Sequence, residues 1–394
     1  MDPMAHKSAL QAILDYYPAR HRFMPLLSTK DIIRLCQTSW TIRRAIMDNE
    51  WDINTKLERF IRYPYQFRSQ LGRSDAFISG SFALQFFERI AYPESDLDIL
   101  VQDSESLESL SEFITTVEGY KMTRDESPYK DAQSIYIRTV QTYMYQATRD
   151  DKIDGKKTGQ SKVQFIVTHD IPLLTALRHF YTTALMNFIT WNKAYSIFPR
   201  ATFLSHETMP LKPVNDYFGE LHRKYSKRGW KMRTQPLDCD MTTKRTDPFG
   251  RRTNRRIGDD DTWVLRLDMV GIEQPSKPDY VLEYCGFQVS AVTSPEVRAQ
   301  VFKSPSLKYR YIYPVVGRSR LFWTELGKFL ARNTYGQLMK MSQSKVDELL
   351  QNKKPPEITP FQLEFEQPEG WDYHDDFIPR LYDHLEAAGA LGVL

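Results

Sequence analysis

The 394-residue chain contains only three cysteines, and Cys36, Cys239 and Cys285 lie far apart. This spacing matches neither a disulfide framework nor a zinc site, and the eight histidines form no paired metal-binding spacing. No apolar run approaches the roughly 18 residues that span a bilayer. The stretch up to Asp15 also lacks the charged-then-apolar layout of a signal peptide. We therefore expect an intracellular protein, cytoplasmic or nuclear, without a membrane partner.

The net charge is small, at +3, but its distribution along the chain is uneven. Segment 222–256 holds twelve Lys and Arg residues against three Asp, a local excess of nine positive charges. Tyr225 and Trp230 lie within this segment. Basic side chains interleaved with aromatic ones can bind a phosphate backbone and stack on bases, so the segment is a candidate nucleic-acid surface. The alternative interpretation is a solvated surface loop.

Helical periodicity dominates the first part of the chain. Apolar residues recur at helical spacing within the first twenty positions, and a second helix follows that Ser28 or Thr29 can cap. A third helical pattern covers 53–71, and we expect Pro64 to end or kink it. These elements predict a small helical lobe over residues 1–69.

Beyond the lobe, the pattern changes to an alternation of strands and helices. The elements we expect are a strand at 76–79, a helix at 82–90, a strand at 97–102, a helix at 104–117 capped by Ser104, hairpin strands at 134–140 and 141–147, a strand at 162–168 and a long helix at 171–192. The last helix is apolar almost all round, which is typical of a buried helix. These elements predict an α+β core over residues 70–200, in which helices flank a mixed sheet.

The remaining residues, 201–394, predict a mixed α/β C-terminal region. The patterns there indicate strands at 263–270 and 280–289, a long amphipathic helix at 320–341 and a short helix near 379–388. The three acids at 259–261 precede the first of these strands, and we interpret them as a solvated turn rather than a cation site.

The stretch GSFALQFFERIAYPESDLDILV, at 80–101, carries the chemistry. Gly80 lies between a strand and a helix, where it lets the backbone approach a ligand closely, and a helix start presents free N–H groups. Ser81 adds a hydroxyl that can contact a phosphate. Asp96 and Asp98 lie two residues apart on a strand, so both point to the same face. Two such carboxylates can hold Mg²⁺, which commonly bridges to nucleotide phosphates.

Gly80, Ser81, Asp96 and Asp98 resemble the signature of the polymerase-beta-type nucleotidyltransferase superfamily. That signature has a Gly-Ser or Gly-Gly pair that opens a helix, followed by Asp-x-Asp on the next strand. Fourteen residues separate Ser81 from Asp96, at the long end of the usual range. The wider sequence also resembles a large group of uncharacterised filamentous-fungal proteins. The resemblance implies a nucleoside triphosphate as substrate or ligand, Mg²⁺ or Mn²⁺ held by Asp96 and Asp98, and triphosphate contacts from Gly80 and Ser81.

Members of this superfamily use a third acid on a later strand, together with two metal ions, to activate the acceptor hydroxyl. The strand at 162–168 is the best candidate here, and Gln164 would face the site with Lys162 and Ile166 on the same side. Glutamine is neutral and cannot act as a base. Three explanations remain open: the catalytic-metal site is lost, a loop acid replaces it, or this strand is not the partner. The acids considered for the second explanation are Asp151, Asp154 and Asp170.

Two weaker features complete the candidates. The segment at 26–46 is similar to the later half of an F-box, which implies a ligase scaffold as partner, although packing within a helical bundle explains it equally well. His169 adjoins the third strand, and we interpret it as a loop histidine. We expect a metal-dependent nucleotidyltransferase-like protein that acts on or binds a nucleoside triphosphate. The alternative is a catalytically degenerate nucleotide-binding protein or an F-box-like adaptor.

Overall fold

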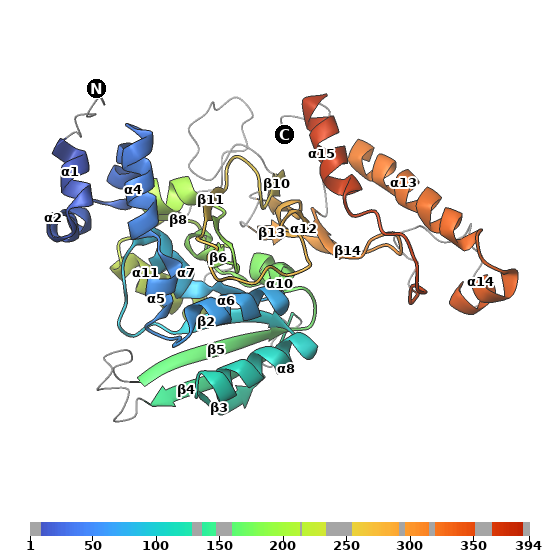
Figure 1. Ribbon diagram of the computed structural model, residues 1–394, viewed down its shortest axis with the longest axis horizontal. Coiled ribbons are helices and arrows are strands. Elements are labelled where there is room, and N and C mark those ends of the chain that lie inside the picture. Colours follow the sequence, from blue (N-terminus) through green and yellow to red (C-terminus); the bar gives the residue numbers. More distant parts are fainter. Residues whose placement is uncertain are drawn as a thin grey trace, which may run out of the picture. The chain divides into compact units, whose positions relative to one another are not determined.

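The chain divides into two compact units, which are described separately. The computed structural model describes residues 9–127, 136–146, 160–212, 215–233, 254–290, 296–314, 320–350 and 365–388. The first unit comprises Met1–Gln235 with Trp263–Pro275, and the second comprises Pro236–Thr262 with Ser276–Leu394. Helices flank a mixed sheet, so the predicted α+β class is confirmed (Figure 1).

Short helices form the beginning of the first unit. They are α1 (Ala9–Asp15), α2 (Tyr17–Phe23), η1 (Met24–Leu26), α3 (Thr29–Cys36), α4 (Trp40–Glu50), α5 (Ile53–Leu57) and α6 (Pro64–Arg73). Ser28 caps α3 in a reciprocal capping box, in which the Asp31 N–H donates to the Ser28 hydroxyl and the Ser28 N–H donates to the Asp31 carboxylate. Pro64 starts α6 instead of kinking one long helix, because proline fits the first helical turn, where its missing N–H is not needed.

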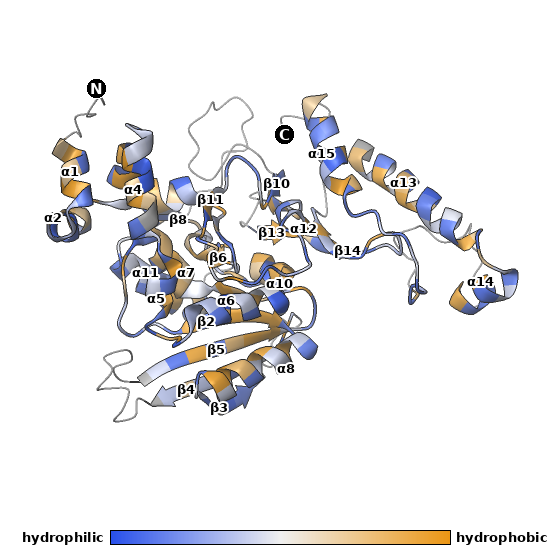
Figure 2. Cartoon of the chain, in the orientation of Figure 1, coloured by the Kyte–Doolittle hydropathy of each residue, from blue (hydrophilic) through white to orange (hydrophobic). Residues whose placement is uncertain are grey.

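An eight-stranded sheet forms the centre of the first unit, in the order β11-β7-β6-β1-β2-β5-β4-β3. The strands are β1 (Phe77–Ser79), β2 (Leu97–Gln102), β3 (Lys121–Glu126), β4 (Ile137–Gln146), β5 (Gln160–Thr168), β6 (Asn187–Ile189), β7 (Lys193–Ser196) and β11 (Trp263–Arg266). Only the pairing of β2 with β5 is parallel, and every other pairing in this sheet is antiparallel. Figure 2 shows hydrophilic residues toward the start of β5 and hydrophobic residues toward its end.

Helices connect these strands. The site helix α7 (Gly80–Glu88) joins β1 to the loop before β2 and contacts β1, β2 and β6. Helix α8 (Glu105–Glu112) begins after Ser104, whose hydroxyl accepts from the Ser106 N–H as a cap, and the π-helical η2 (Phe113–Val117) continues it. This matches the helix and the cap predicted at 104–117.

Two predictions for the core were wrong. The hairpin expected at 134–147 is instead one continuous strand, β4, between β3 and β5. The long helix expected at 171–192 ends early: α10 (Pro172–His179) is followed by η4 (Thr183–Leu185) and then β6. A fully apolar run is buried in either conformation, so its periodicity cannot separate the two. Buried threonine hydroxyls favour the irregular path, because the Thr183 hydroxyl accepts from the Met209 N–H at 2.9 Å.

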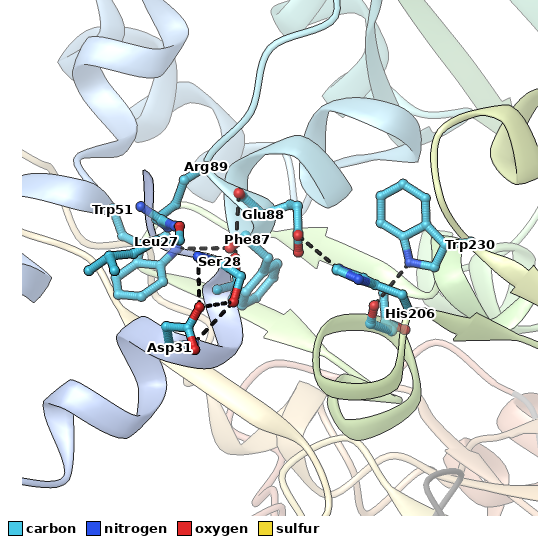
Figure 3. A network of polar contacts seen from close by, with 11 residues as sticks. Leu27, Ser28, Asp31, Trp51, Phe87, Glu88, Arg89, His206 and Trp230 are labelled. Atoms are coloured by element: carbon cyan, nitrogen blue, oxygen red, sulfur yellow. Dashed lines mark hydrogen bonds and ion pairs between the residues drawn. The ribbon is translucent and has the colours of Figure 1, made fainter. Parts of the chain in front are cut away.

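The helical lobe is part of the same hydrophobic core as the sheet. Leu14, Met24 and Ile32 are buried in one cluster with apolar residues of α7 and β2. The last carbonyls of α7 accept hydrogen bonds from the lobe (Figure 3): the Trp51 indole N–H donates to the Phe87 carbonyl at 3.2 Å. The Arg89 guanidinium, directly after α7, donates to the Leu27 carbonyl at 2.6 Å.

The first unit is completed by η5 (Arg200–Ser205), β8 (Glu207–Thr208), α11 (Asp216–Lys227) and β9 (Lys231–Met232). His206, between η5 and β8, lies 3.0 Å from the Glu88 carboxylate at the end of α7 (Figure 3). This hydrogen bond raises the pKa of the His206 imidazole against the opposing effect of its partial burial. The last turn of α7 therefore has partners both in the lobe and after η5.

The second unit contains small sheets and longer helices. Its elements are β10 (Asn254–Arg256), α12 (Tyr280–Glu283), β12 (Gly286–Ser290), β13 (Glu296–Arg298), β14 (Gln300–Phe302), β15 (Tyr311–Tyr313), α13 (Arg320–Leu338), α14 (Gln343–Leu350) and α15 (Phe377–Ala387). The strand expected at 280–289 is half wrong, because α12 occupies its first residues. The long helix at 320–341 and the short helix near 379–388 are present as α13 and α15.

Asp259 corrects the interpretation of 259–261 as a solvated turn. Its carboxylate lies 2.6 Å from the Arg255 guanidinium, and the two side chains are 6% and 1% exposed. Burial alone would raise the pKa of Asp259, but the hydrogen bonds and charge of Arg255 outweigh that effect and hold the pKa below its usual value. The first acid of the three therefore belongs to a buried ion pair.

Candidate functional site

A glycine turn brings α7 directly against the acidic strand β2. Gly80 has φ +66°, in the left-handed region that favours glycine. A Cβ atom at this position would lie 2.2 Å from the Asp98 Oδ2 atom. Ser79 pairs with Asp98 across the antiparallel β1–β2 ladder, which explains this close approach. Only glycine satisfies both the backbone conformation and the available space.

The predicted site residues meet at one cavity of about 440 Å³. Gly80 and Ser81 from the start of α7, Asp96 and Asp98 from β2 and the residue before it, and Gln164 from β5 all line this cavity. The strand expected at 162–168 is β5, and its parallel register places Gln164 beside Asp98. The structure therefore brings together all five residues that the sequence singled out.

Gln164 and Lys162 of β5 both have polar partners on neighbouring parts of the sheet. The Gln164 amide donates to the Thr142 hydroxyl of β4 at 3.3 Å. Lys162, two residues earlier on β5, places its Nζ atom 2.5 Å from the Asp96 Oδ2 atom. Asp96 is thus already paired with a cation of the chain itself.

Of the other acids considered for the site, Asp170 is the one that the structure describes, and it does not line this cavity. Asp170 follows β5, and its carboxylate accepts from the Ile171 N–H at 2.8 Å; it is not among the cavity-lining residues. Asp151 and Asp154 lie outside the described residues. His169 lies beside Asp170, just after β5, and its backbone N–H donates to the Tyr136 carbonyl at 3.2 Å. His169 is therefore a loop residue.

Burial makes Asp98 the most perturbed carboxyl of the site. Desolvation raises its pKa from 3.8 to about 7, and the negative charge of Asp96 adds to the rise. The positive charges of Lys162 and Lys224 act in the opposite direction. A carboxyl in this state binds a proton near neutral pH, and a bound cation would displace that proton.

The loop before Asp96 is braced from two sides. The Arg59 guanidinium donates to the Pro93 carbonyl at 2.5 Å and to the Ser95 carbonyl at 3.2 Å. Gln85 of α7 accepts from the Tyr92 N–H at 2.6 Å, and its amide donates to the Ser81 carbonyl at 2.9 Å. The long connection between α7 and β2 is therefore fixed to the same helix that carries Ser81.

The opposite wall of the cavity was missed by the sequence analysis. Side chains from the end of α10 and from α11 form it: His179, Phe180, Tyr181, Asn215, Phe218, Leu221, Lys224 and Tyr225. A signal for α11 was present, because Phe218, Leu221 and Tyr225 recur at helical spacing after Asn215, which caps the helix by accepting from the Phe218 N–H. The predicted long helix at 171–192 obscured the contribution of α10.

Two aromatic residues of segment 222–256 do not form an exposed stacking surface. Tyr225 and Trp230 are both 3% exposed, and the Trp230 indole N–H donates to the Thr202 carbonyl at 3.0 Å. Tyr225 lines the cavity instead. Residues 234–253 of this basic segment lie outside the described part of the chain.

The chemistry of the donor set suits one cation that shares its coordination with a ligand. Among the residues that the structure describes, no group of three or more His, Cys, Asp or Glu side chains is placed to hold a metal ion. Asp96 and Asp98 supply two carboxylates. The turn at Gly80, which we call the cradle, has no side chain that would press on the Asp98 carboxylate. The buried Ser79 hydroxyl, just before the cradle, has no hydrogen-bond partner within the described ranges. Phosphate oxygens would have to complete the coordination.

Comparison with known proteins adds little to this geometry. No protein-family model and no curated protein sequence matches the chain. Among solved structures, the chain is similar to a CCA-adding enzyme in its apo form, with 15% sequence identity and a TM-score of 0.32. The likeness covers 46% of this chain and 43% of that one. In the described part of the chain, none of the helices has the length and apolar character needed to cross a membrane.

Proposed function

We propose that this protein is nucleotidyltransferase-like and binds a nucleoside triphosphate together with Mg²⁺ or Mn²⁺ in the cavity at the start of α7. The convergence of Gly80, Ser81, Asp96 and Asp98 on one cavity carries the proposal. A strand–glycine–helix turn beside two carboxylates combines a phosphate-binding helix start with cation ligands.

Each wall of the cavity has a distinct role in this proposal. The N–H groups at the start of α7 and the Ser81 hydroxyl hold phosphate oxygens, and the Lys224 ammonium neutralises part of their charge. Asp98 and Asp96 would hold the divalent cation, which would supply positive charge against the phosphates. Phe180 and Tyr181, which are half-buried, provide faces on which a base stacks.

Two residues of β5, Gln164 and Lys162, bear on whether the bound nucleotide is transferred or only held. Transfer of the nucleotidyl group to an acceptor requires a group that takes the acceptor's proton, and neither Gln164 nor Lys162 in its ion pair supplies a carboxylate for that step. These two residues support the second candidate function, a catalytically degenerate nucleotide-binding protein.

The F-box-like adaptor is the weakest of the alternatives. Leu14, Met24 and Ile32 are buried in the hydrophobic core of the first unit, so the lobe already uses much of its apolar surface within the chain. The explanation by packing within the fold needs no ligase scaffold. A nucleic-acid partner for segment 222–256 remains a proposal, without support from Tyr225 and Trp230.

The test is nucleotide binding followed by nucleotidyl transfer. ATP and GTP, each with Mn²⁺, are titrated calorimetrically into wild type, Asp98→Asn and the matched control Asp170→Asn, which alters an acid outside the cavity. We expect binding in wild type and Asp170→Asn and its loss in Asp98→Asn. Labelled nucleotides with total RNA and protein as acceptors then separate transfer from binding alone. Binding that Asp98→Asn leaves intact would disprove the site.

A further inference from the structure

Lys162 occupies a distinctive place in the site. The parallel pairing of Leu97 with Val163 puts the preceding residues, Asp96 and Lys162, side by side at the start of the two strands. The Lys162 ammonium lies 2.5 Å from the Asp96 carboxylate, and the two side chains are 34% and 27% exposed. This is a partly buried, charge-assisted contact at the edge of the cavity, rather than a pair of freely solvated side chains.

The net charge of Asp96, Asp98, Lys162 and Gln164 limits how many divalent ions these residues can hold. With both carboxylates ionised, Asp96, Asp98 and Lys162 together carry one negative charge, and Gln164 adds none. A site built from three carboxylates would carry three. Two divalent cations placed next to each other repel strongly, so they need carboxylates around them to be bound together. The set present here offsets half the charge of one divalent ion before the phosphates of a ligand are added, so it does not provide for a second.

We propose that Lys162 is a built-in cation that takes the place of one divalent ion, so that the cavity binds a nucleoside triphosphate with a single divalent ion. The Lys162 ammonium offsets the charge of one of the two carboxylates, so Asp96 and Asp98 together hold a single divalent ion. Gln164 keeps the neighbouring position on β5 neutral. The inference rests on the proposed function, because it assigns the number of metal ions at the same site.

A simple structural ion pair is the competing explanation. In that case Lys162 would fix β5 to the residue before β2, and its removal would lower stability without changing metal binding. The two explanations therefore differ in metal affinity and stoichiometry, which are measured without any turnover.

The experiment counts Mn²⁺ ions by electron paramagnetic resonance in the full-length protein, with and without a non-hydrolysable ATP analogue. The variants are Lys162→Met, Gln164→Glu and the double variant, and Lys162→Gln is a second replacement in case the methionine variant does not fold. Lys345→Met is the matched control, because Lys345 also pairs with a carboxylate, that of Glu348 at 3.0 Å, on α14 of the second unit. Thermal unfolding establishes that each variant is folded.

Wild type is expected to bind one Mn²⁺ with the analogue. Lys162→Met and Lys162→Gln should raise Mn²⁺ affinity by about tenfold, because a positive charge next to the metal ligands is removed. The double variant should bind two ions, and Lys345→Met should behave as wild type. Two Mn²⁺ ions in wild type, or affinities of the Lys162 variants within twofold of wild type, would overturn the inference while leaving nucleotide binding intact. Absence of both Mn²⁺ and analogue binding in wild type and in every variant would instead remove the proposed function itself, and this inference with it.

Discussion

Replacement of Gly80 by alanine tests the cradle most directly. A non-glycine residue in the left-handed conformation costs roughly 1–2 kcal/mol, and φ at Gly80 is +66°. The new Cβ would also lie 2.2 Å from the Asp98 Oδ2 atom, so this carboxylate must move. Forcing an extra methyl group into a packed site costs about 1–3 kcal/mol. We expect Gly80→Ala to lower the free energy of unfolding of the first unit by about 3 kcal/mol.

The assay is urea unfolding followed by tryptophan fluorescence, with Gly119→Ala as the matched control. Gly119 also has a positive φ, +75°, but a Cβ there would meet only the Tyr145 ring, at an ordinary contact distance of 3.6 Å. The control should therefore show the backbone strain alone, roughly 1–2 kcal/mol. The difference between the two alanine variants isolates the contact with Asp98.

A double-mutant cycle with Asp98→Ala completes this test. Shortening Asp98 removes the atom that the new methyl group would strike, so Gly80→Ala should cost about as little in the Asp98→Ala background as Gly119→Ala does in wild type. Equal costs of Gly80→Ala in both backgrounds would refute the close approach of α7 to β2. A loss no larger than that of Gly119→Ala in wild type would refute it as well.

Three further predictions concern the pH dependence of Asp98 and two contacts elsewhere in the fold. Because the pKa of Asp98 is raised in the folded state from 3.8 to about 7, its protonated form stabilises the fold below pH 4 and this contribution is lost as the pH rises through 7; Asp98→Asn should flatten that decline in urea midpoints measured between pH 4 and 8. Asp259→Ala leaves the Arg255 guanidinium buried without its carboxylate and should cost about 3–5 kcal/mol in urea unfolding, whereas a loss below 1 kcal/mol would contradict the buried pair. Trp51→Phe removes the donor to the Phe87 carbonyl and should cost about 1–2 kcal/mol by thermal unfolding, and an unchanged midpoint would argue against that hydrogen bond.

The site was predictable from sequence because it is local. Gly80, Ser81, Asp96 and Asp98 lie within twenty residues, and their placement at one cavity follows from a glycine turn and from the alternation of side chains along an extended chain. The position of Gln164 required one more step, the choice of β5 as the parallel partner of β2, and the register shows that pairing. Patterns of neighbouring residues were therefore sufficient to predict the side of the cavity that α7, β2 and β5 form.

The opposite wall was not predictable in the same way. The run at 171–192 is apolar throughout, so it fits a buried helix as well as the observed helix, turn and strand. The choice between the two depends on tertiary contacts, because β6 pairs between β1 and β7 in the sheet. Tyr225 and Trp230 were interpreted as candidates for an exposed stacking surface because basic residues surround them in the sequence. In the structure Tyr225 lines the cavity and Trp230 is buried in the core.

Helix α7 has nine residues and is therefore only about 13 Å long. One of its ends forms the cradle, and the other is held by Trp51 and Arg89 (Figure 3). Because the helix is so short, a displacement of its C-terminal end would be expected to shift the cradle at its start as well. A partner that bound the N-terminal lobe by pulling it away from α7 would therefore compete with a ligand in the cavity, and the competition would be reciprocal. A fragment lacking the lobe would leave the end of α7 without the Trp51 hydrogen bond, although β1, β2 and β6 still contact the helix, so we expect occupancy of the cavity to respond to the state of the first sixty residues.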